Sequence, residues 1–299
     1  MRVLISGSTG FIGSALTTAL ANEGHEPVRL VRSTRPDDLP SVTWDPASET
    51  IEPGALDAID AVVHLAGESI ASSRWTSAQK ARIMDSRVNG TRTLARAMAE
   101  STTPPSVFLS GSAIGYYGDT GDHHITEATP PADDFAARVS VAWEQEAAPI
   151  ETDATRLVYL RTGIVLDPSG GALREQLPFF KVGLGGQIGN GRQWFSWISL
   201  ADQVNAMIHL LTADVSGPVN LTAPNPVTNR DFTKTLGRVL NRPTLLPTPK
   251  PALWLRLGRE LSRTLLEGGA RVLPEVLVAS GYQFKDPELE GALARMLKG

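Results

Sequence analysis

The chain has 299 residues, of which 41% are hydrophobic and 20% charged. These values are ordinary for a globular protein, and the length suffices for one large domain or two unequal ones. The formal net charge of -4 gives no electrostatic reason to expect nucleic acid or an anionic membrane as a partner. The sequence contains no cysteine, which excludes disulfides and thiolate catalysis. Without a signal-peptide pattern or an apolar run approaching roughly 18–20 residues, we expect a cytoplasmic protein.

The first thirteen residues predict a strand, a glycine turn and a helix in immediate succession. Residues 3–5 are apolar, and Gly7, Gly10 and Gly13 follow before an apolar-periodic stretch begins. In a dinucleotide-binding turn the first glycine permits the tight bend and the second lets the backbone approach a pyrophosphate. The third lets the helix pack close to the strand. The pattern therefore predicts a dinucleotide site, with a ligand-free glycine turn as the alternative.

The residues after the next predicted strand indicate which dinucleotide binds. Residues 28–31 form that strand, and Arg32 and Ser33 follow it, with no acidic residue before Asp37. A carboxylate here would bond the adenosine ribose, whereas a guanidinium accommodates a 2′-phosphate. We therefore expect NADP in preference to NAD, with a solvated surface arginine as the alternative.

A further apolar strand, at residues 60–67, ends in small residues. Ala66 and Gly67 would let the ribose and phosphates of a cofactor lie against bare backbone. His64 lies within the strand, and we interpret it as a core histidine in preference to a catalytic one. Glu68 follows the glycine as either a substrate-facing carboxylate or a loop charge.

A capping box at residues 76–79 predicts a long helix that continues to about Glu100. Most cations of this helix are expected on its solvated face, while Arg87 is one that could point back at the cofactor. Residues 107–109 are the next predicted strand, and residues 156–165 are the sixth.

Six stretches spread over the whole chain share their motifs with one known family. They cover residues 7–13, 65–68, 110–118, 160–166, 183–198 and 281–284. On these motifs the chain resembles an atypical extended short-chain dehydrogenase/reductase of the NAD-dependent epimerase/dehydratase superfamily. Within it, the resemblance is to the "epimerase family" proteins named as sugar-nucleotide epimerases, which carry a C-terminal domain of unknown function. Each motif is weak alone, and together they are specific.

The resemblance implies an α/β fold: a Rossmann doubly wound parallel sheet with a smaller, discontinuous C-terminal α/β substrate domain. We expect residues 1–166 plus 198–223 to form the NADP-binding domain, and residues 167–197 plus 224–299 the substrate-cleft domain. The expected cofactor-binding residues are Gly7, Thr9, Gly10, Phe11, Ile12, Gly13, Arg32, Ser33, Leu65, Ala66, Gly67 and Arg87. Members of the superfamily often pair through two helices, so the resemblance allows a homodimer.

The superfamily also implies a serine and a tyrosine–lysine pair, and here the chain departs from the pattern. The serine bonds the reacting oxygen, while the tyrosine, aided by a lysine four residues later, moves the proton. Ser112 matches the serine by position, with a turn-capping loop serine as the alternative. No tyrosine of the chain has lysine four residues later, and Ala136 and Ser140 stand near the expected pair. Neither side chain can transfer a proton at neutral pH.

Few groups are available to substitute for the missing pair. Tyr117 and its neighbour Tyr116 lie close to Ser112 in sequence and could donate to a substrate oxygen, and we take Tyr117 as the second catalytic candidate. His123 and His124 titrate in a suitable range, although an exposed loop pair is the favoured interpretation. No His/Asp/Glu cluster has the spacing of metal ligands, so no metal is expected.

The segment at residues 177–197 is rich in glycine and aromatic residues. Three aromatic side chains either wall a substrate cleft or fill the core: Phe179, Trp194 and Trp197. In sugar-nucleotide enzymes a Gln-x-Arg-Asp stretch holds the diphosphate here, but this chain continues from Gln193 without that arginine. Arg192 is the candidate replacement, and a nucleoside-diphosphate sugar cannot be assumed as substrate.

These features predict an NADP(H)-binding oxidoreductase or epimerase-like enzyme acting on a small molecule of unknown identity. Hydride would pass at the nicotinamide while Ser112 orients the substrate oxygen and a group other than the usual tyrosine handles the proton. The missing pair supports an alternative, a non-catalytic protein that senses NADPH or serves as a scaffold. A third alternative is another nucleotide, such as FAD or S-adenosylmethionine, at the glycine turn.

Overall fold

An eight-stranded sheet forms the centre of the computed structural model, which describes residues 1–34, 39–71, 73–245, 247–248, 254–255 and 257–298. In spatial order the strands are β12 (Gly217–Leu221), β8 (Arg156–Thr162), β6 (Val107–Ala113), β5 (Ala61–His64), β1 (Arg2–Ser6), β2 (Glu26–Val31), β3 (Ser41–Asp45) and β4 (Thr50–Ile51). Every neighbouring pair is parallel except β3 and β4. The chain winds outward in one direction from β1 to β3 and in the other from β5 to β12. The predicted α/β class and doubly wound parallel sheet are therefore confirmed.

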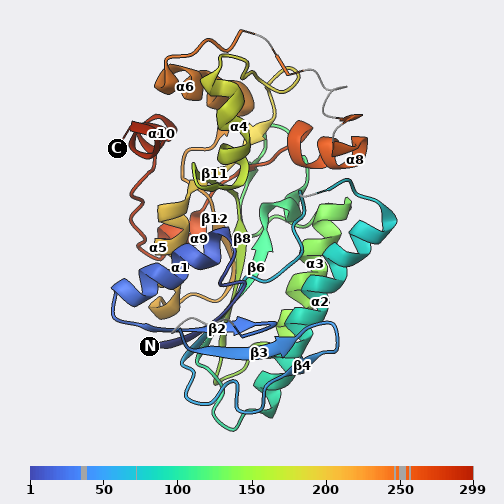
Figure 1. Ribbon diagram of the computed structural model, residues 1–299, viewed down its shortest axis with the longest axis vertical. Helices are drawn as coiled ribbons and strands as arrows, with labels where there is room; N and C mark the ends of the chain where they lie inside the picture. Colours follow the sequence, from blue (N-terminus) through green and yellow to red (C-terminus); the bar gives the residue numbers. More distant parts are fainter. Residues whose placement is uncertain (35–38, 72, 246, 249–253, 256, 299) are drawn as a thin grey trace.

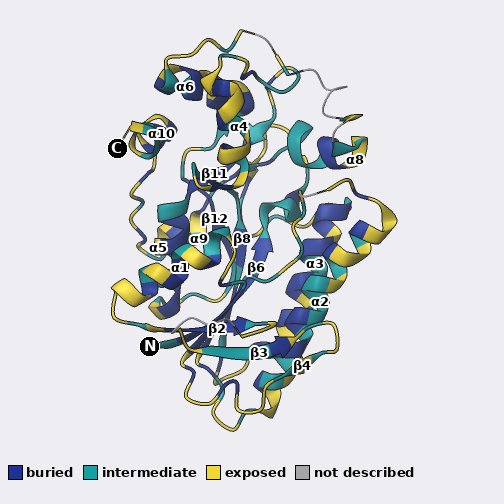
Figure 2. Ribbon diagram, in the orientation of Figure 1, coloured by how far each residue is buried: buried dark blue, intermediate teal, exposed yellow. Residues whose placement is uncertain are grey.

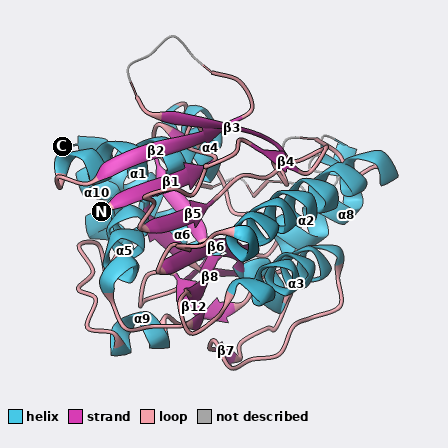
Figure 3. Ribbon diagram, turned by 90° about the horizontal axis from the view of Figure 1, so that it is seen from below, coloured by secondary structure: helices cyan, strands magenta, loops and turns pink. Residues whose placement is uncertain are grey.

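Helices cover both faces of this sheet, as Figure 3 shows. One face carries α1 (Phe11–Asn22), α5 (Leu200–Thr212) and the short α9 (Glu275–Ala279). The opposite face carries α2 (Ser77–Glu100) and α3 (Phe135–Ala147), which pack on each other. The central strands are consequently buried on both sides, which explains their nearly continuous apolar runs (Figure 2).

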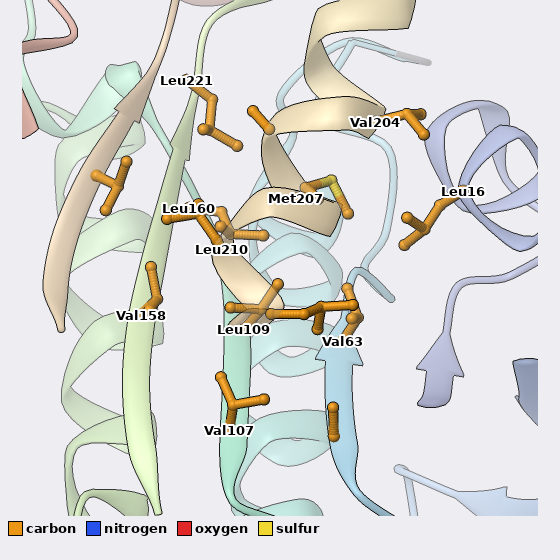
Figure 4. Packing of buried hydrophobic residues seen from close by; sticks show 14 of the residues in the cluster. Leu16, Val63, Val107, Leu109, Val158, Leu160, Val204, Met207, Leu210 and Leu221 are labelled. Carbon is orange, nitrogen blue, oxygen red and sulfur yellow. The ribbon is translucent and has the colours of Figure 1, made fainter. Parts of the chain in front are cut away.

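Along each central strand, successive side chains point alternately into the apolar cores on the two faces of the sheet. In β6, Leu109 joins Leu16 of α1 and Met207 of α5 on one face (Figure 4), whereas Phe108 packs with Leu94 of α2 on the other. Each such side chain removed from water stabilises the fold by about 1.5–3 kcal/mol. The helices are therefore fixed to the sheet mainly by apolar burial.

Of the element boundaries predicted from the sequence, the start of α2 agrees with the structure and the extent of the sixth strand does not. The Thr76 hydroxyl accepts a hydrogen bond from the Gln79 amide at 3.1 Å and caps α2, as the capping-box pattern predicts. The predicted sixth strand is broken, because β8 ends at Thr162 and the chain turns at Gly163. A Cβ at Gly163 would lie 2.7 Å from the Ser196 carbonyl oxygen, so only glycine fits this bend.

Beyond the bend the chain enters a second group of elements, which lies past the carboxyl end of β6 (Figure 1). Its helices are α4 (Gly171–Lys181), α6 (Asn229–Leu240) and α10 (Leu289–Lys298). Its strands pair as β9 (Ile164–Asp167) with β11 (Trp197–Ser199), and β10 (Trp194–Phe195) with β13 (Val227–Thr228). The remaining elements are η1 (Ile114–Tyr117), β7 (His124–Ile125), η2 (Ala148–Ile150), α8 (Arg259–Ser262), η3 (Arg263–Glu267) and β14 (Arg271–Val272).

This second group has its own apolar core. Phe180, Phe232 and the fully buried Trp197 pack together there, so Trp197 is a core residue and not a cleft wall. The predicted domain division at residue 166 stays a prediction. Among the described residues, no helix is both long enough and apolar enough to cross a membrane.

A buried carboxylate, Asp202 of α5, fastens the C-terminal segment to the rest of the protein. Its oxygens accept hydrogen bonds from the Tyr282 hydroxyl and from the Lys285 and Asp286 amides, each at 2.8 Å, and from the Ser199 hydroxyl at 3.2 Å. Burial and the adjacent Asp202 carboxylate raise the pKa of Tyr282, so its phenol keeps its proton and donates.

We expect Asp202→Asn to lower the free energy of unfolding by about 2–4 kcal/mol, because an amide NH₂ would face hydrogen-bond donors inside the core. Urea denaturation provides the measurement. The control is Asp231→Asn at the exposed cap of α6, which should cost less than about 1 kcal/mol. Equal, small losses in both variants would contradict the role given to Asp202.

Candidate functional site

A cleft of about 690 Å³ opens at the carboxyl ends of β1, β2, β3 and β5. The residues lining it are 7–10, 30–33, 44–47 and 65–68 from the strand ends, together with Arg82, Asp85, Ser86 and Asn89 of α2. The strand order reverses between β1 and β5, and such switch points are where open α/β sheets bind their ligands.

The glycine turn forms the inner wall of this cleft. Gly7 has φ +69°, and a Cβ there would lie 2.9 Å from the Leu65 carbonyl carbon. Gly13 packs against the Gly7 backbone with no room for a side chain. Gly10 precedes α1 without a capping side chain, so the first N–H groups of the helix are unsatisfied from within it. The turn thus presents bare backbone and a helix dipole, an arrangement suited to phosphate.

Arg32 and Ser33 lie at the outer end of the same cleft, where β2 ends. Asp45, at the end of the neighbouring β3, also lines it. The Ser48 hydroxyl and the Ala47 amide lower the pKa of Asp45, and the charge of Arg32 adds to that effect. No local sequence signal marks Asp45, because it lies 13 residues beyond Arg32, and only the pairing of β2 with β3 makes the two residues neighbours.

A serine–histidine pair shapes the strand end opposite the glycine turn. The Ser6 hydroxyl accepts hydrogen bonds from the Leu65 and Ala66 amides at 3.0 and 3.1 Å, and it contacts His64 Nδ1 at 2.6 Å. Because that hydroxyl accepts two bonds, its proton points to Nδ1, and His64 carries its own proton on Nε2. The backbone at Leu65 and Ala66, predicted to contact cofactor, is thereby held in place.

His64 is fully buried among the rings of Trp44, Phe108 and Trp143. Burial, with a smaller effect from the charge of Arg87, lowers the pKa of His64 to about 3. The histidine is therefore neutral at physiological pH, which confirms the interpretation of it as a core residue.

Arg87 lies beneath the loop at Gly67 and is not among the residues that line the cleft. Its guanidinium donates to the Glu68 carbonyl at 2.9 Å and lies 5.0 Å from the centre of the Trp143 ring. Burial lowers the pKa of Arg87 to about 10, against the opposing charge of Glu68. The structure thus gives Arg87 a role in fixing the loop, and Arg82 is the arginine of α2 that reaches the cleft.

Phe11 and Ile12 begin α1 on the other side of the glycine turn. The Phe11 ring packs so closely on Gly170, at the start of α4, that no side chain fits there. Ile12 packs against the apolar core between the sheet and α5. Phe11 lines a second hollow of about 600 Å³, which shares Thr9 and Gly10 with the cleft.

Ser112 belongs to a polar row that crosses three strands near their carboxyl ends. It pairs in register with Arg161 of β8, which pairs in turn with Asn220 of β12. The carboxylate of Glu144, on α3, accepts a hydrogen bond from the Ser112 hydroxyl at 2.7 Å. It also accepts two hydrogen bonds from the Arg161 guanidinium at 2.8 and 2.9 Å. All four residues are buried. The Ser112 hydroxyl is consequently engaged inside the protein.

The phenol of Tyr117 completes this network. Its hydroxyl donates to Asn220 Oδ1 at 2.7 Å and accepts from Arg161 at 2.9 Å. Burial raises the pKa of Tyr117 to about 12, although Arg161 and Asn220 act in the opposite direction. Burial by itself would lower the pKa of Arg161, but Glu144 and Tyr117 raise it. These contacts give Ser112 and Tyr117 structural roles, and their catalytic roles stay predictions.

The helix that should carry the acid–base pair, α3, presents no such group. Ala136 lies against Gly115 of η1, where a Cβ would be 3.3 Å away, and the Ser140 hydroxyl donates to the Ala136 carbonyl. One turn further along α3, Glu144 forms an ion pair with Arg161. The backbone of η1 therefore fills the space beside Ala136.

The other candidates are not among the residues that line the cleft. His123, His124 and Arg192 are exposed, Phe179 is half exposed, and the Trp194 indole donates to Asp122 at 2.9 Å. Within the described part of the chain, no group of three His, Asp or Glu residues could hold a metal ion.

Comparisons with known proteins agree with this geometry. A family model described as "NAD dependent epimerase/dehydratase family" matches residues 3–222, and one described as "Domain of unknown function (DUF1731)" matches residues 248–296. Epimerase family protein Mb2239 of Mycobacterium bovis is 42% identical over 292 residues, which cover 97% of this chain and 96% of that protein. The resemblance predicted from the motifs is confirmed.

Two solved structures extend the likeness to three dimensions. The crystal structure of human epimerase family protein SDR39U1 with NADPH has a TM-score of 0.93 at 35% identity, covering 100% of this chain and 99% of that one. The nucleoside-diphosphate sugar epimerase from Corynebacterium glutamicum has a TM-score of 0.80 at 34% identity, covering 99% of this chain and 58% of that one.

Because His64 is buried and neutral, we expect the protein to become less stable at acidic pH. Its pKa is about 3 in the folded protein, against 6.5 for the unperturbed group, so the unfolded chain binds the extra proton between these values. The free energy of unfolding should therefore fall by up to about 1.4 kcal/mol per pH unit below pH 6.5. Urea denaturation over this range should show a shallower pH dependence in His64→Gln, and an unchanged slope would contradict the assignment.

Glu144→Gln should lower the free energy of unfolding by about 3–5 kcal/mol, because it leaves the buried Arg161 cation without a counter-charge. Glu146→Gln is the matched control on the same helix, since Glu146 pairs with the more exposed Arg92. We expect the control to cost less than about 1 kcal/mol in guanidinium denaturation. A Glu144 variant as stable as the control would remove the ion pair from its structural role.

Proposed function

Because the chain belongs to the NAD dependent epimerase/dehydratase family, we propose that it binds NADP(H) in the cleft and exchanges hydride with a small carbonyl or hydroxyl compound. One observation carries the coenzyme assignment: Arg32 and the glycine turn line the same cleft at the switch point of the sheet. The 2′-phosphate would meet Arg32, and the pyrophosphate would meet the backbone at Gly10. The crystal structure of the SDR39U1 protein with NADPH supports this choice.

The residues present fit such a coenzyme. The close approach of Gly7 to Leu65 and the lack of a capping side chain at Gly10 leave a backbone cradle. The Ser8 hydroxyl, which is buried at the turn, has no hydrogen-bond partner among the described residues and is available to a phosphate oxygen. When bound, the coenzyme supplies or accepts hydride at its nicotinamide ring.

The substrate is proposed to be a small molecule and not a nucleic acid, in agreement with the net charge of -4. The chain lacks the arginine that would follow Gln193 in sugar-nucleotide enzymes, and Arg192 is exposed. A carbonyl or hydroxyl compound without a nucleotide handle therefore fits these residues better than a nucleoside-diphosphate sugar.

A second candidate function is an NADPH-sensing or scaffold protein without turnover. The observation that favours it is that the Ser112 hydroxyl already donates to Glu144 at 2.7 Å, while α3 carries only Ala136 and Ser140 at the positions of the expected acid–base pair. Such a protein would bind the coenzyme and lack an acid–base group.

Coenzyme titration and turnover assays separate the two functions. Calorimetry with NADPH and NADH measures binding, and a panel of carbonyl and alcohol compounds then measures coenzyme oxidation or reduction. Turnover supports the enzyme, whereas NADPH binding without turnover across the panel supports the sensor. Failure to bind either nicotinamide coenzyme would contradict both functions.

Arg32→Asp should weaken NADPH binding about 10–100-fold while leaving NADH affinity nearly unchanged, because it removes a charge-assisted contact to the 2′-phosphate only. The control is Arg192→Asp, which makes the same charge change at an exposed residue that does not line the cleft. Calorimetric dissociation constants give the result. Equal weakening of both coenzymes, or none, would remove Arg32 from the phosphate site.

A further inference from the structure

Tyr116 differs from the other phenol in η1 by being partly exposed. The two rings meet edge to face, with centres 5.3 Å apart, so the phenols occupy different positions. The Tyr117 hydroxyl is held by Asn220 and Arg161, whereas the Tyr116 hydroxyl makes no hydrogen bond to any described residue. Tyr116 is therefore the phenol of this turn that can bond a ligand.

A permanent cation lies directly against the Tyr116 ring. The Arg161 guanidinium carbon is 3.6 Å from the ring centre. Two bonds to Glu144 and one to the Glu127 carbonyl hold the guanidinium in that position. Arginine cannot lose its proton under ordinary conditions, so its charge persists while a neighbouring phenol gives up a proton. A buried cation stabilises a phenolate more than a neutral phenol.

The turn also stands where an acid–base group is needed. It directly follows the carboxyl end of β6, which places it at the ligand-binding end of the sheet. Gly115, the residue before Tyr116, contacts Ala136, the position on α3 from which a proton-carrying side chain is missing. The turn that carries the phenol therefore lies against α3 at this position, and the cation from β8 lies against the phenol ring.

We propose that Tyr116 is the proton carrier of the hydride-transfer reaction and that Arg161, fixed by Glu144, is the positioning residue that stabilises its phenolate. The inference rests on the proposed function. In carbonyl reduction the substrate carbon gains hydride from the reduced coenzyme, and the substrate oxygen takes the proton of the Tyr116 hydroxyl. The products are the alcohol and the oxidised coenzyme, and the phenolate recovers a proton from water.

The first test needs no substrate. Tetranitromethane nitrates accessible phenols, and peptide mass spectrometry identifies the modified residue. We expect Tyr116 to be nitrated before the buried Tyr117, and NADPH at ten times its dissociation constant to slow that nitration about tenfold. Nitration of Tyr116 that NADPH leaves unchanged would place the phenol away from the nicotinamide and overturn the proposal.

The second test is kinetic. With a compound that the wild-type protein turns over, Tyr116→Phe should lower kcat about 100-fold or more, while the dissociation constant for NADPH and the free energy of unfolding stay within error. The matched control is Tyr159→Phe, which removes a partly buried phenol of β8 that packs in the core between the sheet and α2 and should retain activity. Equal kcat in the wild type and Tyr116→Phe would overturn the proposal.

Removing the cation tests the positioning role. Because loss of Arg161 alone strands Glu144, the variant is the double substitution Arg161→Met with Glu144→Leu, which replaces the buried pair by apolar groups of similar size. We expect slower nitration of Tyr116 in this folded variant, with NADPH affinity retained, and an unchanged rate would contradict the role of Arg161. NADPH-protected nitration without turnover of any substrate would instead identify a failure of the proposed function.

Discussion

The buried ion pair between Glu144 and Arg161 is the interaction on which the packing of α3 against the sheet depends. Their closest oxygen and nitrogen atoms are 2.8 Å apart, and both side chains are buried between α3 and the sheet. Removing two charges from water is costly unless every polar atom finds a partner. Ser112, Tyr117 and the Glu127 carbonyl supply those partners, and the network consequently fixes how α3, η1 and three strands sit against one another.

The same network joins the C-terminal segment to the sheet. Asn220, at the end of the polar row, donates to the Leu273 carbonyl and also, through its backbone, to Glu127. Glu127 accepts a further bond from the Val276 amide at the start of α9. Burial raises the pKa of Glu127, and the hydrogen bonds from the Asn220 and Val276 amides act in the opposite direction. The two matched families, over residues 3–222 and 248–296, are therefore joined in one structure by hydrogen bonds as well as by apolar packing.

The cleft is organised by a different constraint, the close approach of backbone to backbone. Gly7 lies so near Leu65 that a side chain would collide with it, and Ser6 then holds the Leu65 and Ala66 amides. His64 orients Ser6 from among buried aromatic rings, where burial keeps the imidazole neutral. Backbone geometry therefore forms the phosphate-facing side, while the side chains of Arg32, Asp45 and Arg82 surround the remainder. This division suits a ligand with a constant diphosphate and a variable outer group.

The sequence by itself determined the parts of this protein that depend on local chemistry. Apolar runs predicted the strands, Thr76 predicted the start of α2, and Gly7, Gly10 and Gly13 predicted the turn, because each signal acts within a few residues. The absence of the tyrosine–lysine pair also followed from the sequence alone. Only the tertiary structure placed Asp45 beside Arg32, turned Arg87 beneath the loop at Gly67, and brought Arg161 against Tyr116. Those contacts join residues that are far apart in sequence. They depend on strand pairing and helix packing, and a local sequence pattern cannot predict either.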